Sequence, residues 1–477
     1  MNLWKLEAGE TITYGTNLFQ WIEIAGPFTV AFKFQLSSLY EQLYSQRHKP
    51  SLPIFHFSQC VFSVELAEKE TMSFAYDLPD EIMRETLLRL PVKSLLRFMS
   101  VSKTFHSLIS NPHFITSHLL HHSTKSPPYL IFCHYDMQLR KRCFTLHSSD
   151  DPFTLKPIES PFPYPHCNNN QFFDIVGSLN GLLCLAYADL LGFDDYIFWN
   201  PSINKSICLP RPNITFDSHG SSTCFLGFGF HPKTDDHILV RLVYLVSDTS
   251  SNTAPPLVEI YTLRTGEWKS VTSPATRYVF GDKALSVSLN GAIHWLARAP
   301  LLRNVIVVFD MGDKVFREMA VPKSLEGVEQ DLNMGVVVVD GLLALVSCNL
   351  WQGESSYTVW VMKEYGEAES WTKLFDIVGV RLGRVLGFRK NGEVVVVSKA
   401  GKLLSYEPSC QKTLDPDIRG GIDSFYLDNH IESLVLLNVE DGVMGRQASS
   451  SSASKGKEKG ENEGKRYILD VTSAPLF

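Results

Sequence analysis

The sequence lacks the features of several familiar classes of protein. No stretch approaches about 18 consecutive apolar residues, so we expect no transmembrane helix and no membrane partner. Positive charge is not in excess, because 44 Lys and Arg face 51 Asp and Glu, a net charge of −7. Nucleic-acid binding requires clustered positive charge, so no nucleic-acid partner is expected. The nine cysteines form no C-x-x-C pair, which predicts buried free thiols in a reducing compartment, the cytosol or nucleus.

The motifs of common catalytic and cofactor sites are missing as well. There is no G-x-x-x-x-G-K-[ST] loop, no G-x-S-x-G elbow and no H-E-x-x-H helix. Gly227-Phe228-Gly229 is half of a dinucleotide motif, without the third glycine or the following helix, and is interpreted as part of a strand. We therefore expect no cofactor.

Two kinds of polar cluster could in principle form a metal or catalytic site. His118, His121 and His122 have helical spacing but no third type of metal ligand nearby. The adjacent carboxylates at 194–195 and 235–236 lie in expected turns, where such pairs are usually solvated. The sequence therefore predicts no catalytic, cofactor-binding or metal-binding residues.

Four zones follow one another along the chain. Residues 1–71 show no clear period and form an unassigned N-terminal extension, with Met72 directly ahead of the first patterned segment. Residues 72–121 are predicted to be a helical module, and residues 128–438 a β-domain of many short strands. Within the tail 439–477, the Ser, Gly, Lys and Glu tract 446–466 is too poor in apolar residues to fold.

The helical module has the apolar period of short helices separated by prolines. Pro79 suits a first helical turn, and Ile82, Met83, Leu87 and Leu90 then lie on one face. Three further helices are predicted, at Val92–Met99, from Val101 to Ile109 and through Phe114 to Leu120. About 45 residues cannot bury enough surface to form a robust domain, so the module completes its core against something else. The pattern leaves open whether that is a partner protein or the chain's own β-domain.

Several runs of this module carry a family resemblance: Leu78-Pro79-Asp80-Glu81-Ile82, Leu88 to Phe98, Val101-Ser102-Lys103, Leu108-Ile109 and Asn111-Pro112-His113-Phe114. They resemble the F-box motif over about 45 residues, with a dozen positions in order and spacing. The chain departs from the motif at Met99-Ser100, where the family usually has Arg-Cys, and at Phe105, where it favours Trp.

The resemblance implies docking to the Skp-type adaptor, and through it to the cullin, of a Skp–cullin–F-box ubiquitin ligase. Residues 76–119 are expected to suffice for that docking. Some of the residues carried over from the family must instead hold the module's own core. The implied adaptor-binding residues are Leu78, Pro79, Ile82, Leu90, Pro91, Leu95, Phe98, Val101, Lys103 and Phe105.

The β-domain repeats a turn signal at intervals of about 50 residues. Asn180-Gly181, Asn290-Gly291, Asp340-Gly341 and Asn391-Gly392 are each followed by alternating apolar residues, as in a hairpin. A unit with Pro232 to Asp236 in place of Asn-Gly fills the gap between the first two. A second hairpin in each unit makes four strands per repeat, which is typical of a β-propeller blade.

Counting these units from Tyr129 gives about six blades. His430–Leu437 is predicted to be a lone strand that pairs with Tyr129–Cys133 and closes the ring. The region resembles the kelch-like F-box-associated domain of plant F-box proteins, through its Asn-Gly and Trp-Asn-Pro turns. A β-sandwich is the alternative. The predicted fold class is thus α+β multidomain, a helical F-box followed by an all-β propeller-like domain.

Two functions fit these features. One is a non-enzymatic adaptor, whose helical module docks to the ligase and whose β-domain binds an unknown target protein for ubiquitination. The other is an enzyme on a propeller scaffold with a helical cap, since a fold does not fix a function. Active-site residues on the central face would favour the enzyme, and a mixed loop surface the adaptor.

Overall fold

The structure is a computed structural model of the 477-residue chain. It describes residues 80–125, 129–136, 138–139, 141–147, 156–158, 172–189, 192–246, 254–281, 285–328, 334–351, 354–378, 382–389 and 391–439, and three strands ahead of residue 68. Residues Leu78 and Pro79 and the tract 446–466 lie outside the described residues. None of the helices in the described part is long and apolar enough to span a membrane.

The N-terminal extension contains a small antiparallel sheet in the order β1-β2-β3. Its strands are β1 (Leu18–Glu23), β2 (Thr29–Phe34) and β3 (Ser63–Ala67). The expectation that this segment shows no period is wrong for β2, where Val30, Phe32 and Phe34 alternate with less apolar residues. That residues 1–71 are dispensable for folding and adaptor binding stays a prediction.

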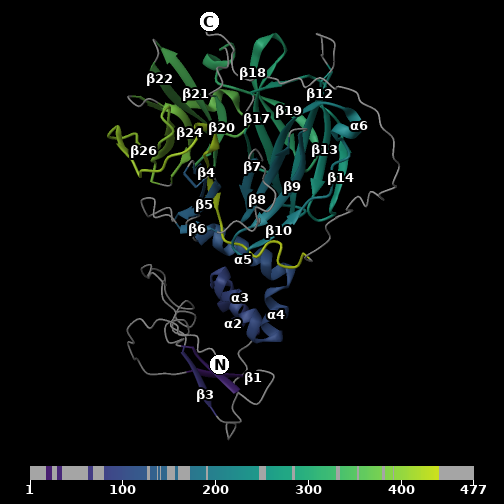
Figure 1. Cartoon of the computed structure of the whole chain (residues 1–477), viewed down its shortest axis with the longest axis vertical. Helices are drawn as coiled ribbons and strands as arrows, with labels where there is room; N and C mark the ends of the chain where they lie inside the picture. The colour runs from purple at the N-terminus through teal and green to yellow at the C-terminus, as the bar shows by residue number, and fades with distance from the viewer. Residues whose placement is uncertain are drawn as a thin grey trace, which may run out of the picture.

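Four helices form the module that follows (Figure 1). They are α2 (Asp80–Leu88), α3 (Val92–Val101), α4 (Lys103–Ile109) and α5 (Pro112–Lys125). The breaks at Pro91 and Asn111 fall where the proline and asparagine signals predict them. The predicted helix from Val101 begins instead at Lys103, because Val101 ends α3 and Ser102 caps α4. The last helix is longer than the predicted short segment, because residues 121–125 continue its turns.

Six antiparallel sheets form the β-domain. The first three in ring order contain β28 (Tyr426–His430), β4 (Tyr129–Asp136), β5 (Lys141–His147) and β6 (Lys156–Ile158); then β7 (Phe172–Leu179), β8 (Leu182–Asp189), β9 (Gly192–Asn200) and β10 (Lys205–Cys208); then β11 (Ser222–His231), β12 (Asp236–Leu245), β13 (Leu257–Thr262) and β14 (Glu267–Val271).

The remaining sheets complete the ring. They contain β15 (Val279–Phe280), β16 (Ser286–Leu289), β17 (Ala292–Ala299), β18 (Arg303–Asp310) and β19 (Val315–Ala320); then β20 (Gly335–Val339), β21 (Leu342–Trp351), β22 (Glu354–Met362) and β23 (Trp371–Ile377); then β24 (Leu382–Phe388), β25 (Val394–Ser398), β26 (Leu403–Glu407) and β27 (Lys412–Leu414). The short helix α6 (Phe216–His219) links the β10 and β11 sheets. A central cavity of about 270 Å³ is lined by the innermost strands, as expected of a propeller.

The repeated turn signal marks real hairpins. At Asn180-Gly181, Asn290-Gly291 and Asp340-Gly341 both residues have positive φ, and the flanking strands pair across a two-residue loop. The fourth site differs, because β24 and β25 pair only from Phe388 and Val394, so that Asn391-Gly392 lies in a longer loop. The prediction of six four-stranded blades is confirmed, with the β15–β19 sheet carrying a fifth short strand.

The ring closes as predicted, but with a different strand. β28 pairs antiparallel with β4, Tyr426 opposite Cys133 and His430 opposite Tyr129. The predicted strand His430–Leu437 is therefore wrong beyond His430: the chain turns there, and Leu436 has a φ of +73°. The apolar residues of this segment do not share one sheet face, because they pack against different parts of the molecule.

The segment 431–439, which we call the C-terminal strap, joins the helices to the propeller. Leu434 is fully buried in the core of the helical module, whereas Leu436 packs between the sheets of β7–β10 and β11–β14. The buried Asn200 amide donates to the carbonyl oxygens of Ser433 (3.0 Å) and Val435 (2.7 Å). Figure 1 shows the strap, in yellow, passing between α5 and the sheets.

Replacing Gly181 by Ala should weaken this junction more than the same change at Gly341. Both glycines have left-handed φ, +80° and +77°, so both variants carry the strain of an alanine there, about 1 kcal/mol. A Cβ at Gly181 would also lie 2.5 Å from the Ile431 carbonyl oxygen in the strap, whereas nothing lies within 4 Å at Gly341. Overpacking adds about 1–3 kcal/mol. Urea unfolding of both variants measures the difference, and equal losses would contradict the contact.

Candidate functional site

The helical module has a compact core that the strap completes. Its buried residues are Leu87, Leu88, Val92, Leu95, Phe98, Phe105, Ile109, Phe114 and Leu434. The Phe98 and Phe105 rings meet edge to face at 5.3 Å, which fixes α3 against α4. Ser102 caps α4 by accepting the backbone N–H of Phe105. The sequence left open whether the module completes its core against a partner or against its own chain. The structure shows that Leu434 of the chain's own C-terminal strap forms part of this core.

The described part of the predicted adaptor-binding set divides into two groups. Leu95, Phe98 and Phe105 are buried in the core of the module. The others reach the surface: Ile82, Leu90 and Val101 are half-buried, and Pro91 and Lys103 are exposed. Direct contact with a partner is therefore open to the second group, while the first group supports it from beneath. The contact set as a whole stays a prediction.

The surface of the helices also carries residues that the family resemblance did not single out. Lys93 and Arg97 are exposed, like the predicted Lys103, and neither forms an ion pair with another residue that the structure describes. A shallow groove of about 670 Å³ between α2 and α4 is lined by Glu81, Arg84, Lys103, Thr104, Ser107, Leu108 and Asn111. In the predicted helix Val92–Met99, Lys93 and Arg97 lie off the apolar face, and this pattern in the sequence indicates that they are exposed.

The histidines of α5 hold the corner between α2 and α3. The Nε2–H of His118 donates to the Leu90 carbonyl oxygen at 2.9 Å, and that of His122 to Leu88 at 3.2 Å. These two carbonyl oxygens lie at the C-terminal end of α2, where backbone C=O groups have no N–H donor within the helix. The Nε2 atoms of His118 and His122 are therefore used as hydrogen-bond donors, so these two histidines have a structural role. Burial lowers the pKa of His118 to about 4.

Acid should weaken the helical module through His118. Its pKa lies near 6.5 in the unfolded chain and is lowered to about 4 in the fold, so between these values only the unfolded chain takes up the proton. The free energy of unfolding should therefore fall as pH drops from about 6.5 to 4, by up to about 3 kcal/mol. Thermal unfolding at pH 7.5 and 5 measures the loss. The variant His118→Gln keeps a donor but not the titration, and an equal loss in that variant would contradict the assignment.

The propeller presents a second surface at the end opposite the helices. Asp235, in the β11–β12 turn, accepts a hydrogen bond from Thr116 of α5 at 2.8 Å, so the turns at this end of the strands face the helices. The other ends of β12, β13, β17 and β18 therefore point away, as Figure 1 shows for β12 and β18. We call the surface at these strand ends the distal face.

Two exposed leucines stand out on the distal face. Leu301 and Leu302, between β17 and β18, are 99% and 64% exposed. Both have left-handed φ, +64° and +59°, which costs a non-glycine residue about 1–2 kcal/mol. Val246 and Val279, at the ends of β12 and β15, are also largely exposed. A strained, apolar loop on a rigid scaffold is typical of a binding surface.

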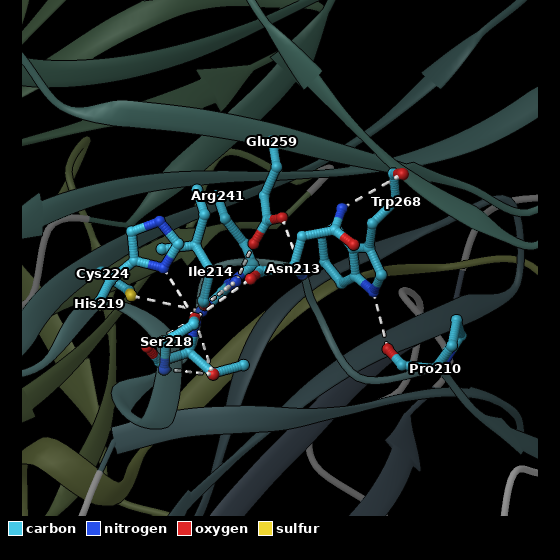
Figure 2. A network of polar contacts seen from close by, with 10 residues as sticks. Pro210, Asn213, Ile214, Ser218, His219, Cys224, Arg241, Glu259 and Trp268 are labelled. Carbon is cyan, nitrogen blue, oxygen red and sulfur yellow. Dashed lines mark hydrogen bonds and ion pairs between the residues drawn. The ribbon is translucent and has the colours of Figure 1, made fainter.

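A buried ion pair fixes the connection that enters the β11 sheet (Figure 2). Arg241 of β12 and Glu259 of β13 form this pair at 1% and 0% side-chain exposure. Arg241 donates to the Ile214 carbonyl oxygen at 3.1 Å, and Glu259 accepts from the Asn213 backbone N–H at 3.1 Å. The guanidinium also lies over the rings of Tyr196 and Trp268. The pair therefore anchors the β10–β11 connection.

Two groups considered for chemistry have structural partners. Asp236 accepts the backbone N–H of Arg264 at 2.9 Å, while Asp235 binds Thr116. A Cβ on Gly229 would lie 2.5 Å from Met311 Sδ, and one on Gly227 would overlap the Trp295 ring. Gly227 and Gly229 are thus strand glycines at a close sheet contact, as predicted. Cys133 and Cys184 are buried, as predicted for the cysteines, but Cys208 and Cys410 are exposed, so the prediction of buried thiols is wrong for these two.

Comparison with protein families finds two matches that follow one another along the chain. The F-box domain matches residues 76–117, and the F-box associated beta propeller domain matches residues 132–413. The first match covers α2, α3, α4 and the first part of α5, and the second covers most of the ring of sheets.

Curated relatives from Arabidopsis thaliana are similar over most of their length. The F-box protein CPR1 is 30% identical over 319 residues, which are 63% of this chain and 73% of the relative. The F-box/kelch-repeat protein At3g23880 is 30% identical over 64% of this chain and 80% of the relative. The F-box protein At3g07870 is 27% identical over 75% of this chain and 91% of the relative.

Proposed function

Because the chain belongs to the F-box proteins that carry an F-box associated beta propeller domain, we propose that it is the substrate-recognition subunit of a Skp–cullin–F-box ubiquitin ligase. Its F-box helices dock to a Skp-type adaptor, and its propeller binds a target protein for ubiquitination. Its part in the reaction is non-catalytic. It raises the effective concentration of the target beside the transfer machinery. It acts in the cytosol or nucleus, which imaging of a fluorescent fusion tests.

One observation supports the proposal that the adaptor and the target bind to different surfaces. The F-box helices pack on the face of the tight turns, through Asp235 and the strap, which leaves the distal face and its exposed leucines free. A target held on the distal face and an adaptor held on the helices would occupy opposite ends of the molecule. Both partners can therefore bind at once, as a tethering subunit requires.

The adaptor surface is tested with the full chain and a purified Skp-type adaptor. Ile82→Ala combined with Val101→Ala removes two half-buried side chains that docking would bury. Each buried side chain of this size contributes about 1.5–3 kcal/mol, so capture should weaken at least about tenfold. The matched control is Val315→Ala with Leu414→Ala, which trims two exposed apolar residues of the propeller. The same weakening is expected for Leu78→Ala with Pro79→Ala.

The distal face is tested separately. Leu301→Asp with Leu302→Asp should abolish capture of target proteins under proteasome inhibition, because charge replaces the exposed apolar loop. Adaptor capture should stay unchanged in this variant. Unchanged target capture would overturn the distal face as the target site, and unchanged adaptor capture by the Ile82 and Val101 variant would overturn the docking surface.

A further inference from the structure

The β4–β5 hairpin brings three metal-binding types of side chain together. His134 on β4 lies directly opposite Cys143 on β5, and Asp136 follows His134 by two residues. Opposed residues, and residues two apart on a strand, share one face of a sheet. One ligand atom of each of the three lies within 4.8 Å of the others. The face therefore presents nitrogen, oxygen and sulfur ligands at one point.

The imidazole is buried and lacks a hydrogen-bond partner at one nitrogen. His134 is 7% exposed, and its Nδ1 has no partner among the residues that the structure describes. Its ring stacks on Phe132 and Phe425, with centroids 5.3 and 5.9 Å away, so its orientation is fixed. An orphaned buried nitrogen is costly unless a ligand satisfies it.

Asp136 and Cys143, the other two residues of the cluster, are held in place but keep an atom that can bind a metal ion. Asp136 Oδ1 accepts the backbone N–H groups of Gln138 and Leu139, both at 2.8 Å, which fixes the carboxylate and leaves Oδ2. The Cys143 thiol donates only a long hydrogen bond, of 4.0 Å to the Lys141 carbonyl oxygen, among the residues that the structure describes. The nearby Arg142 is directed elsewhere, to Asp174 and the Ser424 carbonyl oxygen. Lys141 is exposed, so its ammonium group is free to turn outward.

We propose that His134, Asp136 and Cys143 bind one zinc ion, with water as the fourth ligand. Imidazole, carboxylate and thiolate together are ligands that Zn²⁺ prefers, whereas Mg²⁺ and Ca²⁺ prefer oxygen alone. Ligand atoms of tetrahedral zinc lie about 3.3–3.8 Å apart, so side-chain movements of about 1 Å complete the site. The carboxylate and the thiolate together balance the charge of the ion. The site joins the two strands next to the ring-closing strand β28, and thus strengthens the closure.

Cobalt is the spectroscopic probe for this site. The full chain, without a histidine tag, is freed of metal with a chelator and titrated with Co²⁺. Tetrahedral Co²⁺ with one thiolate should give a sulfur-to-metal charge-transfer band and intense visible bands, at one equivalent, and Zn²⁺ should displace them. Zn²⁺ should also raise the melting temperature.

Matched variants assign the ligands. Cys143→Ser should remove the charge-transfer band, whereas Cys410→Ser, at an exposed cysteine far along the chain, should leave it unchanged. Asp136→Asn keeps an oxygen for the Gln138 and Leu139 N–H groups, and should weaken Co²⁺ binding at least about tenfold without unfolding the hairpin. A spectrum without a thiolate band, or one that survives Cys143→Ser, would overturn the proposal.

Discussion

Arg241→Met should be among the most destabilising single changes in the propeller. The variant leaves the Glu259 carboxylate buried at 0% exposure without its cation, and removes the donor to the Ile214 carbonyl oxygen. Breaking a buried ion pair by removing one partner costs about 3–5 kcal/mol, because the remaining charge is uncompensated. Urea unfolding measures the loss.

Two further variants separate this explanation from a general intolerance of substitution. In Arg241→Met with Glu259→Gln the stranded charge is gone, so the double variant should be more stable than Arg241→Met alone. Lys323→Met breaks an ion pair with Glu369 whose side chains are 80% and 82% exposed, and should cost under about 1 kcal/mol. A double variant no more stable than the single one would show that the charge of Glu259 is not the cause.

Removing the C-terminal strap should loosen the F-box helices and abolish adaptor capture. A chain ending at His430 keeps the closing strand β28 but loses Leu434 from the core of the helices and the hydrogen bonds of Asn200. Leu434→Ala alone should cost about 2–5 kcal/mol, since the residue is fully buried. Thermal unfolding and adaptor capture are the measurements.

Two further truncations test whether the loss of adaptor capture comes from the strap. A chain ending at Val439 keeps the whole strap and should behave like the full chain, and one ending at Asp428 also shortens β28 and should destabilise the ring as well. Leu414→Ala, at a half-exposed position, is the point-variant control. The expectation that residues 76–119 suffice for docking fails if this prediction holds, because that fragment lacks Leu434. Full adaptor capture by the chain ending at His430 would restore that expectation.

The sequence by itself determined the elements whose cause is local. Pro91 set the start of α3 and Asn111 the end of α4, and the Asn-Gly pairs at 180 and 290 specified two-residue turns, because few other residues adopt positive φ. The 50-residue period of these turns gave the number of blades, and the F-box runs gave the family. The alternation of apolar residues in β2 is likewise a local feature of the sequence.

Only the tertiary structure decided which residues meet across long separations. Ile431–Leu437 is as apolar as a strand, yet Leu434 and Leu436 enter two different cores, because the segment lies where the helices and two sheets converge. Likewise, Leu95 and Ile82 both fit the F-box pattern, and only packing buries one and leaves the other at the surface. His134 and Cys143 are nine positions apart without a motif spacing, and the register of β4 with β5 places them opposite each other. Local preference fixes turns and helix ends, whereas contacts between distant segments depend on how all the elements pack together.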